Sequence, residues 1–185
     1  MQCPKDRTVE LVGGTLAGDL PVQCCADCGG NWIPPENYHD WRARHDLQGL
    51  DTMPKTLDDL NYVQSPLDSK GGLCPDCGCF LSRSKVGSRN PFYVERCPKC
   101  GGIWCDRGEW DVLEKLGLTG VIDQLFMNEW QVRLREREWA LRERQATIDK
   151  LGEDLAQLVF DLAEQLEKHP NGDFGVAYLM RRFAK

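Results

Sequence analysis

The sequence predicts an α+β fold: two small modules, each a β-hairpin closed by a short helix, precede a long α-helical, coiled-coil-like C-terminal region. Three observations lead to this prediction. Six of the ten cysteines stand in C-x-x-C pairs, two cysteine-rich segments repeat one another, and a seven-residue apolar period runs through residues 121–168. Paired cysteines of this spacing indicate metal ligation, and an apolar period with almost no breakers apart from Gly152 indicates helix.

The two cysteine-rich segments align with each other. The aligned pairs are Cys3 with Cys74, Cys25 with Cys97, Cys28 with Cys100 and Trp32 with Trp104. The offset is 71 residues for the first pair and 72 for the others, so the two hairpins differ by one residue. An internal duplication of one small module is the simplest explanation. Cys79 and Cys105 align with Thr8 and Ile33, which are not metal ligands, and we interpret both as partly buried thiols.

Both modules contain the same succession of predicted elements. Two β-rich stretches occur in each, namely Thr8–Leu16 with Pro21–Cys24 and Phe80–Val86 with Phe92–Arg96. The glycines expected at the hairpin turns are Gly13, Gly14 and Gly87. A helix then closes each module, at Pro34–Arg44 and at Asp106–Leu116. Pro34 and Pro35 suit a helix start, and Asp106 with Glu109 three residues later suits an N-terminal capping box.

The second module contains a complete set of tetrahedral metal ligands. They are Cys74, Cys77, Cys97 and Cys100, in the spacing C-x2-C-x19-C-x2-C. Zinc binds four such thiolates, two from each turn of a zinc ribbon. A module of about 40 residues buries too little apolar surface to fold by itself, and metal binding stabilises it. We therefore expect zinc here. Rubredoxin-like iron is the alternative, because four thiolates alone do not choose between the two metals.

The first module lacks one of the four thiolates. Its matching cysteines are Cys3, Cys25 and Cys28, whereas Asp6 occupies the position of Cys77. A carboxylate oxygen can bind zinc, so Asp6 is the first candidate for the fourth ligand. The alternatives are Cys24, His39 and His45, or a site that has lost its metal. With both sites complete, the chain would bind two zinc ions.

The second module also carries a longer motif. It reads C-P-x-C at 74–77 and C-P-x-C-G-G-x-W-x-D-R-G-E at 97–109, and on these residues the segment 74–116 resembles the prokaryotic zinc ribbons of the transcription-factor-IIB type. Residues 3–45 resemble the same family more loosely, with CPKD in place of C-P-x-C. The resemblance implies two zinc ribbons. It covers about half of the chain and implies little about the function, because fold and function are separable.

The remaining segments separate and follow the two expected ribbons. The predicted domains are ribbon 1 at 1–45, a linker at 46–73, ribbon 2 at 74–117 and a helical region at 118–185. The apolar period of the helical region comprises Met127, Leu134, Leu141, Ile148, Leu155 and Leu162. Arg137 and Arg144 interrupt the adjoining apolar positions. The pattern allows one long helix or two, with an apolar seam that closes a hairpin within the chain, forms a homodimer or binds a protein partner.

Composition and charge narrow the classes of function. The net charge of −6 argues against a protein whose main task is to hold duplex DNA by its phosphates. The first residues lack the pattern of a signal peptide, and no apolar run reaches the length of a membrane span. We therefore expect a cytoplasmic location, where cysteines stay reduced and can bind metal.

A function as a binding protein fits these observations better than catalysis. No general base stands near the expected ligands, so we expect no enzyme activity. The favoured function is a zinc-binding protein-interaction or adaptor protein, such as an auxiliary or assembly factor of a larger complex. The first alternative is a nucleic-acid-binding ribbon with a contact face made of Arg83, Lys85, Arg89, Phe92 and Tyr93. The second is a redox protein with rubredoxin-like iron.

Overall fold

The computed structural model describes residues 1–45, 62–87 and 91–184. Within them the fold is α+β, as predicted, with a six-stranded antiparallel sheet and six helices. The chain divides into two compact units, Met1–Arg135 and Glu136–Lys185. The sheet lies in the first unit together with three short helices, and the second unit is helical.

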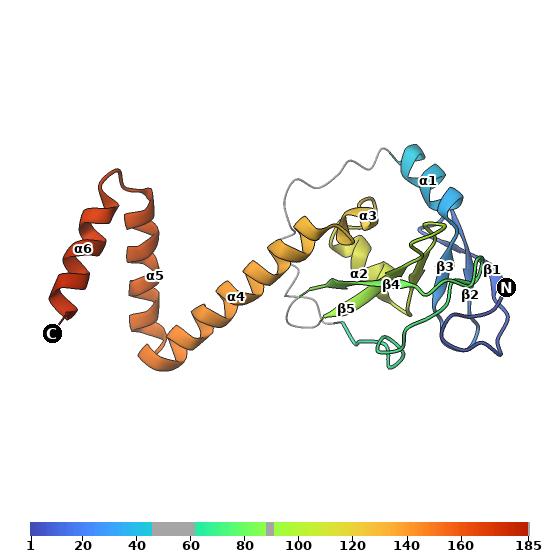
Figure 1. Ribbon diagram of the computed structural model, residues 1–185, viewed down its shortest axis with the longest axis horizontal. Coiled ribbons are helices and arrows are strands. Elements are labelled where there is room, and N and C mark those ends of the chain that lie inside the picture. Colours follow the sequence, from blue (N-terminus) through green and yellow to red (C-terminus); the bar gives the residue numbers. More distant parts are fainter. Residues whose placement is uncertain (46–61, 88–90, 185) are drawn as a thin grey trace. The chain divides into compact units, whose positions relative to one another are not determined.

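The sheet joins the two predicted modules. Its strands are β1 (Val12–Leu16), β2 (Leu20–Cys24), β3 (Asn31–Ile33), β4 (Ser82–Val86), β5 (Phe92–Arg96) and β6 (Ile103–Cys105). Their order across the sheet is β1-β2-β3-β6-β5-β4, so one hairpin stands at each edge and the two short strands meet in the middle (Figure 1). Both hairpins match the stretches predicted from the sequence, except that β2 begins one residue earlier, at Leu20.

The turn of the first hairpin differs from the prediction. Gly13 and Gly14 lie inside β1, and the chain reverses instead at Ala17 and Gly18, where φ is 50° and 81°. Gly14 has a packing role, because a Cβ built on it would lie 2.4 Å from the Cys24 Sγ on β2. The glycine pair thus reflects close approach of a neighbouring side chain, which a turn motif does not distinguish.

At the central strands, the tryptophan of each module packs against a glycine of the other module. Trp32 on β3 faces Trp104 on β6 in the register of the pair. A Cβ on Gly30 would lie 2.2 Å from Trp104 Cζ2, and a Cβ on Gly102 would lie 2.2 Å from Trp32 Cζ2. The knuckle glycine of each module therefore leaves the space that the indole of the other module fills. The two modules share one buried interface and are not independent domains.

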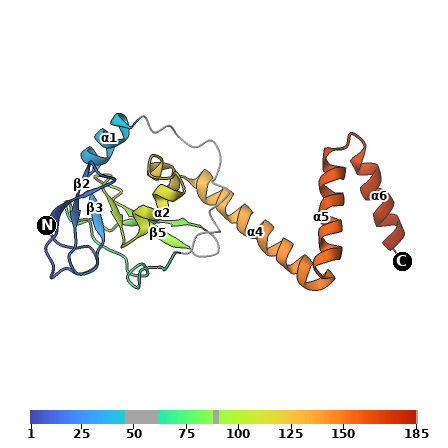
Figure 2. The same cartoon turned by 180° about the vertical axis from the view of Figure 1, so that it is seen from behind.

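Side chains alternate between the two faces of the sheet, as they must in a β-strand. On one face, strand residues such as Ile33 and Ile103 pack against α1 (Pro35–Arg44), α2 (Glu109–Lys115) and α3 (Ile122–Leu125) (Figure 2). The buried Tyr38 hydroxyl of α1 donates to the Thr119 carbonyl at 2.7 Å and accepts from the Ile122 N–H at 3.1 Å. The other face carries Trp32, Trp104 and the cysteines of the C-x-x-C pairs with Cys3 and Cys79, whereas Cys24 and Cys105 belong to the first face.

The α2 helix begins at Glu109, three residues after the predicted start at Asp106, and its N-cap residue Gly108 makes no side-chain cap hydrogen bond. The Asp106 backbone N–H donates to Glu109 Oε2 at 2.8 Å and the Glu109 N–H donates to the Asp106 carbonyl, so these two residues close a turn that precedes α2. The Asp106 side chain instead accepts a hydrogen bond from Trp104 Nε1 at 2.7 Å. After α2, Gly117 has a φ of 68° and ends the helix, as the sequence predicts.

The predicted linker at 46–73 is described from residue 62 onward, and residues 46–61 lie outside the described structure. The described part packs on the second hairpin. The rings of Tyr62 and Phe92 lie 5.1 Å apart, and Asp68 is fully buried. The segment that leads into the second module therefore belongs to the same compact unit as the sheet.

The C-terminal residues form separate helices and not one continuous helix. These are α4 (Asn128–Leu151), α5 (Glu153–Lys168) and α6 (Gly172–Phe183). Gly152, with a φ of 78°, separates α4 from α5. α5 and α6 lie side by side as a helical hairpin, in which Gly175 approaches Leu166 (Figures 1 and 2). Among the described residues, no helix combines the length and the apolar character that crossing a membrane requires.

Candidate metal centres

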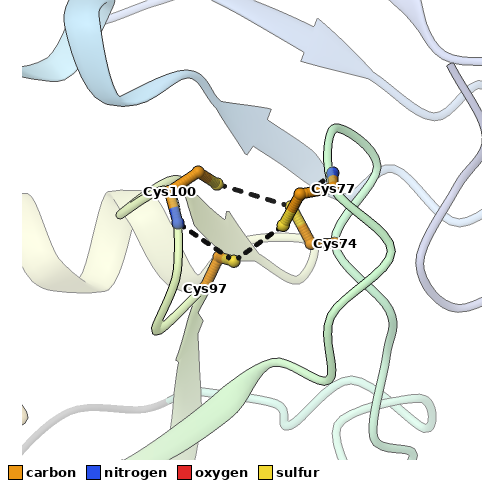
Figure 3. A group of neighbouring side chains, drawn as sticks. All are labelled: Cys74, Cys77, Cys97 and Cys100. Carbon is orange, nitrogen blue, oxygen red and sulfur yellow. Dashed lines mark hydrogen bonds between the residues drawn. The ribbon is translucent and has the colours of Figure 1, made fainter.

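Four sulfurs converge in the second module (Figure 3). The knuckle that bears Cys74 and Cys77 faces the knuckle that bears Cys97 and Cys100, which joins β5 to β6. The Sγ atoms of Cys74 and Cys100 lie 3.5 Å apart, those of Cys77 and Cys97 lie 3.4 Å apart, and all four are within 4.8 Å of one another. In a tetrahedral site with metal–sulfur bonds of about 2.3 Å, neighbouring sulfurs are about 3.8 Å apart. The arrangement therefore fits a four-thiolate metal.

The same distances exclude disulfides between these residues. A disulfide joins its sulfurs at about 2.05 Å, whereas all ten cysteines are free thiols. Backbone N–H groups point at the sulfurs: Cys77 N–H donates to Cys74 Sγ and Cys100 N–H donates to Cys97 Sγ, at 3.5 and 3.4 Å. Such donors stabilise negative charge on a thiolate. Both knuckles are therefore shaped for ionised sulfur.

The electrostatics of Cys77 favour ligation as well. A hydrogen bond from the backbone of Cys79 and the neighbouring Cys97 thiol lower the pKa of Cys77 to about 6. This thiol is exposed enough to be ionised near neutral pH, which is the state that binds metal. Burial raises the pKa of Cys74, so its proton leaves when a cation arrives and offsets the desolvation.

Three sulfurs converge in the first module. The Sγ atoms of Cys3, Cys25 and Cys28 lie within 4.8 Å of one another, and those of Cys3 and Cys28 are 3.7 Å apart. This knuckle has the same backbone hydrogen bond as the Cys74–Cys77 knuckle of the second module. Asp6 N–H donates to Cys3 Sγ at 3.4 Å, just as Cys77 N–H donates to Cys74 Sγ. This cluster, too, is able to hold a metal ion.

The carboxylate of Asp6 is turned away from these three sulfurs. Its Oδ1 accepts hydrogen bonds from the Thr8 backbone N–H at 3.0 Å and the Thr8 hydroxyl at 2.7 Å, and these bonds lower the pKa of Asp6. The structure therefore does not bring Asp6 into the cluster, although it stands at the right place on the knuckle. Its role as the fourth ligand stays a prediction.

The other candidates for a fourth ligand point elsewhere. Cys24 packs beside Gly14 in the core on the opposite face of the sheet. His39 is exposed on α1, and His45 Nε2 lies 3.0 Å from Asp19 Oδ1. Cys79 and Cys105 lie outside both clusters, as the alignment of the modules predicts. Within the described residues, the first cluster thus has three ligands in place.

Comparisons of the chain with protein-family models, with curated proteins and with solved structures found no match. The assignment of these centres therefore depends on the geometry alone.

A small core ties the two clusters together. Their cysteines pack with Trp32 and Trp104, both of which are almost completely buried. Trp32 Nε1 donates to Asp76 Oδ2 at 3.1 Å, and Asp76 lies in the first knuckle of the second module. The tryptophan of the first module thus braces the metal ligands of the second. Both clusters support the β3–β6 interface from the same face of the sheet.

The basic face of the second hairpin, predicted as an alternative contact with nucleic acid, includes a cation that bonds to other groups of the chain. Arg83 turns toward the protein, where its guanidinium donates to the Asp68 carbonyl, lies 3.4 Å from Glu95 Oε1 and sits 4.3 Å over the Tyr93 ring. Arg89 lies outside the described residues. Arg83 therefore contributes to internal charge balance and is not a free cation of the predicted contact face.

A third group of potential ligands was not predicted from the sequence. Asp68, Asp106 and Glu109 are all buried, and each places a carboxylate oxygen within 4.8 Å of the other two. Asp106 and Glu109 were expected to cap a helix, which accounts for their spacing. Asp68 has no sequence signal, because it lies in a segment with the composition of a linker.

Proposed function

We propose that the chain is a zinc-binding adaptor protein in which two zinc ions hold the sheet and the helical tail binds another protein. The observation that carries the proposal is that the thiolate clusters and most of the exposed apolar side chains lie in different parts of the chain. The thiolate clusters lie inside a small core with two tryptophans, as structural metals do. Most of the exposed large apolar side chains of the described residues lie C-terminal to residue 126, in the helical tail, although Val63 and Phe80 of the first unit are exposed as well.

Zinc is the proposed metal in both clusters, with Asp6 as the fourth ligand of the first. Four thiolates satisfy zinc without redox chemistry, and one rotation of the Asp6 side chain away from Thr8 would exchange two hydrogen bonds for a metal bond. The likeness of residues 74–116 to zinc ribbons of the transcription-factor-IIB type agrees with this assignment. Rubredoxin-like iron remains the second candidate, and a colourless protein would exclude it.

The proposed contact surface is the α5 face, which we define as Leu155, Leu158 and Leu162. These residues recur at helical spacing, and their exposed fractions are 51%, 66% and 42%. Apolar side chains aligned on one helix face gain free energy when a second surface covers them, by roughly 25 cal/mol for each Å² removed from water. A protein partner or a second copy of the chain would provide such a surface.

A charge placed on the α5 face tests the proposal. We expect Leu162→Glu to weaken self-association in sedimentation velocity, or to remove partners recovered by crosslinking in cells. Ala163→Glu is the control, because it adds the same charge to an exposed neighbouring position that points away from the α5 face. A monomeric wild-type chain whose crosslinked partners are unchanged by Leu162→Glu would contradict an adaptor function through the tail.

A nucleic-acid-binding function is less well supported. The net charge is −6, and the cationic Arg83 pairs with buried acidic groups of the chain. Binding to phosphates through clustered cations depends steeply on salt. Retention on RNA or DNA that falls steeply as salt rises would favour this alternative over the adaptor function.

A further inference from the structure

Four buried carboxylates gather around Lys5 and Arg83, near the start of α2. This acidic cluster comprises Asp68, Glu95, Asp106 and Glu109, with exposed fractions of 0%, 0%, 2% and 0%. Among the described residues, two cationic side chains pair with it. Lys5 Nζ lies 2.9 Å from Glu95 Oε1 and 3.6 Å from Asp106 Oδ2, and Arg83 reaches Asp68 and Glu95 at 3.4 Å. When all four carboxylates are ionised, the cluster therefore has two negative charges more than positive ones.

Several oxygens of the acidic cluster have no hydrogen-bond donor among the described residues. They are Glu95 Oε2, Asp106 Oδ2 and Glu109 Oε1. The other oxygens are used: Trp104 donates to Asp106 Oδ1, and the Asp106 N–H donates to Glu109 Oε2. A buried carboxylate oxygen without a partner costs on the order of 1–3 kcal/mol or more. Glu109 is thus fully buried, has one oxygen without a donor, and places a carboxylate oxygen within 4.8 Å of those of Asp68 and Asp106.

The spacing of the carboxylates suits a cation that prefers oxygen. Asp68, Asp106 and Glu109 each offer one oxygen, and these oxygens lie within 4.8 Å of one another. Calcium binds oxygens at about 2.3–2.6 Å, so one ion can bridge oxygens that are up to about 5 Å apart. Thiolates and imidazoles are absent from this group, and a donor set made of carboxylates selects hard cations over zinc.

We propose that Asp68, Asp106 and Glu109 bind a hard divalent cation, Ca²⁺ or Mn²⁺, at a third metal site distinct from the two thiolate clusters. Two positive charges balance the two excess negative charges, and the ion takes the place of the missing donors at Asp106 and Glu109. The ion would also join the segment around Asp68 to the start of α2. It fastens the chain that precedes the second module onto the sheet.

Protons are the competing explanation for the same cluster. Burial raises the pKa of Glu95 to about 7 and holds the pKa of Glu109 well above its usual range. Two protonated carboxyls would remove the same charge excess without any metal. The two explanations differ in one measurable respect, because only the first requires a bound divalent ion at neutral pH.

The experiment uses the full-length, zinc-loaded chain after other divalent ions have been removed. Mn²⁺ is titrated in, and the loss of the electron paramagnetic resonance signal of the aqueous ion counts the bound ions. We expect one Mn²⁺ per chain, displaced by Ca²⁺. Glu109→Gln removes one ligand charge and keeps the size of the side chain, so it should weaken binding roughly tenfold or more. Asp111→Asn removes the same charge from an exposed position of α2 and should bind as the wild type does.

Two results of the Mn²⁺ titration would overturn the proposal. One is a wild-type chain that binds neither Mn²⁺ nor Ca²⁺ at millimolar concentrations, which would leave protons as the explanation. The other is equal binding by Glu109→Gln and Asp111→Asn. Should Glu109→Gln fail to fold, Tb³⁺ bound to the wild type decides the location, because Trp104 donates to Asp106 at 2.7 Å and should sensitise its luminescence. Tb³⁺ that binds without luminescence excited through tryptophan would also overturn the site.

Discussion

Replacement of Gly102 by alanine should disrupt the interface between the two modules. The added Cβ would lie 2.2 Å from Cζ2 and 2.4 Å from Cη2 of Trp32, a fully buried side chain. Ordinary carbon–carbon contacts are about 3.5–4.0 Å, so the overlap exceeds 1 Å on a rigid ring. The backbone of Gly102 is not in the left-handed region, so the effect is one of packing.

The expected cost of this substitution follows from the overlap. Overpacking of a well-filled core costs about 1–3 kcal/mol and occasionally more, and an overlap this large on a rigid ring belongs near the upper end. Loss of glycine entropy in the unfolded chain offsets about 0.4–1 kcal/mol. We therefore expect Gly102→Ala to lower the free energy of unfolding by about 2 kcal/mol. Gly30→Ala should cost a similar amount, because it meets Trp104 at the same 2.2 Å.

Urea unfolding at a fixed free zinc concentration, followed by tryptophan fluorescence, measures this cost. Gly13→Ala is the matched control, since nothing lies within 4 Å of a Cβ at that strand position. The control should be neutral or slightly stabilising. If Gly102→Ala and Gly13→Ala agreed within about 0.5 kcal/mol, the close packing of glycine against tryptophan would be refuted as a source of stability.

Three further substitutions test other parts of the structure. Tyr38→Phe leaves the buried Thr119 carbonyl and Ile122 N–H without their partner, so urea unfolding should show a loss of about 1–3 kcal/mol. Lys5→Met removes the cation that pairs with the buried carboxylates of Glu95 and Asp106. The same assay should show a loss of about 3–5 kcal/mol in the free energy of unfolding. An unchanged midpoint would argue against the buried ion pair. Asp6→Ala should release one zinc to a competing chelator that leaves the wild type intact, and equal retention would remove Asp6 from the ligands.

The features that the sequence predicts well are local. A hairpin between two knuckles of fixed spacing leaves little freedom, so the positions of β4 and β5 and the convergence of Cys74, Cys77, Cys97 and Cys100 could be predicted from spacing and turn residues. Helix ends at residues such as Gly117 follow from local backbone preference.

The features that the sequence does not predict depend on long-range packing. β3 and β6 contain three residues each, and nothing in so short a strand specifies its partner. The position of Asp68 in the acidic cluster likewise depends on how a segment of linker composition folds onto β4 and β5. Asp6 shows the limit at the candidate metal site: alignment places it on the knuckle, but its carboxylate accepts hydrogen bonds from Thr8, a contact that the alignment does not predict.

Metal content per chain tests the central claim most directly. Elemental analysis of the purified protein should find two zinc ions per chain and no iron, if both thiolate clusters are structural sites. Cys74→Ser should lower the content by one, whereas Cys79→Ser, which changes a thiol outside the clusters, should leave it unchanged. Zinc content below one per chain in the wild type, or full zinc content in Cys74→Ser, would contradict the claim.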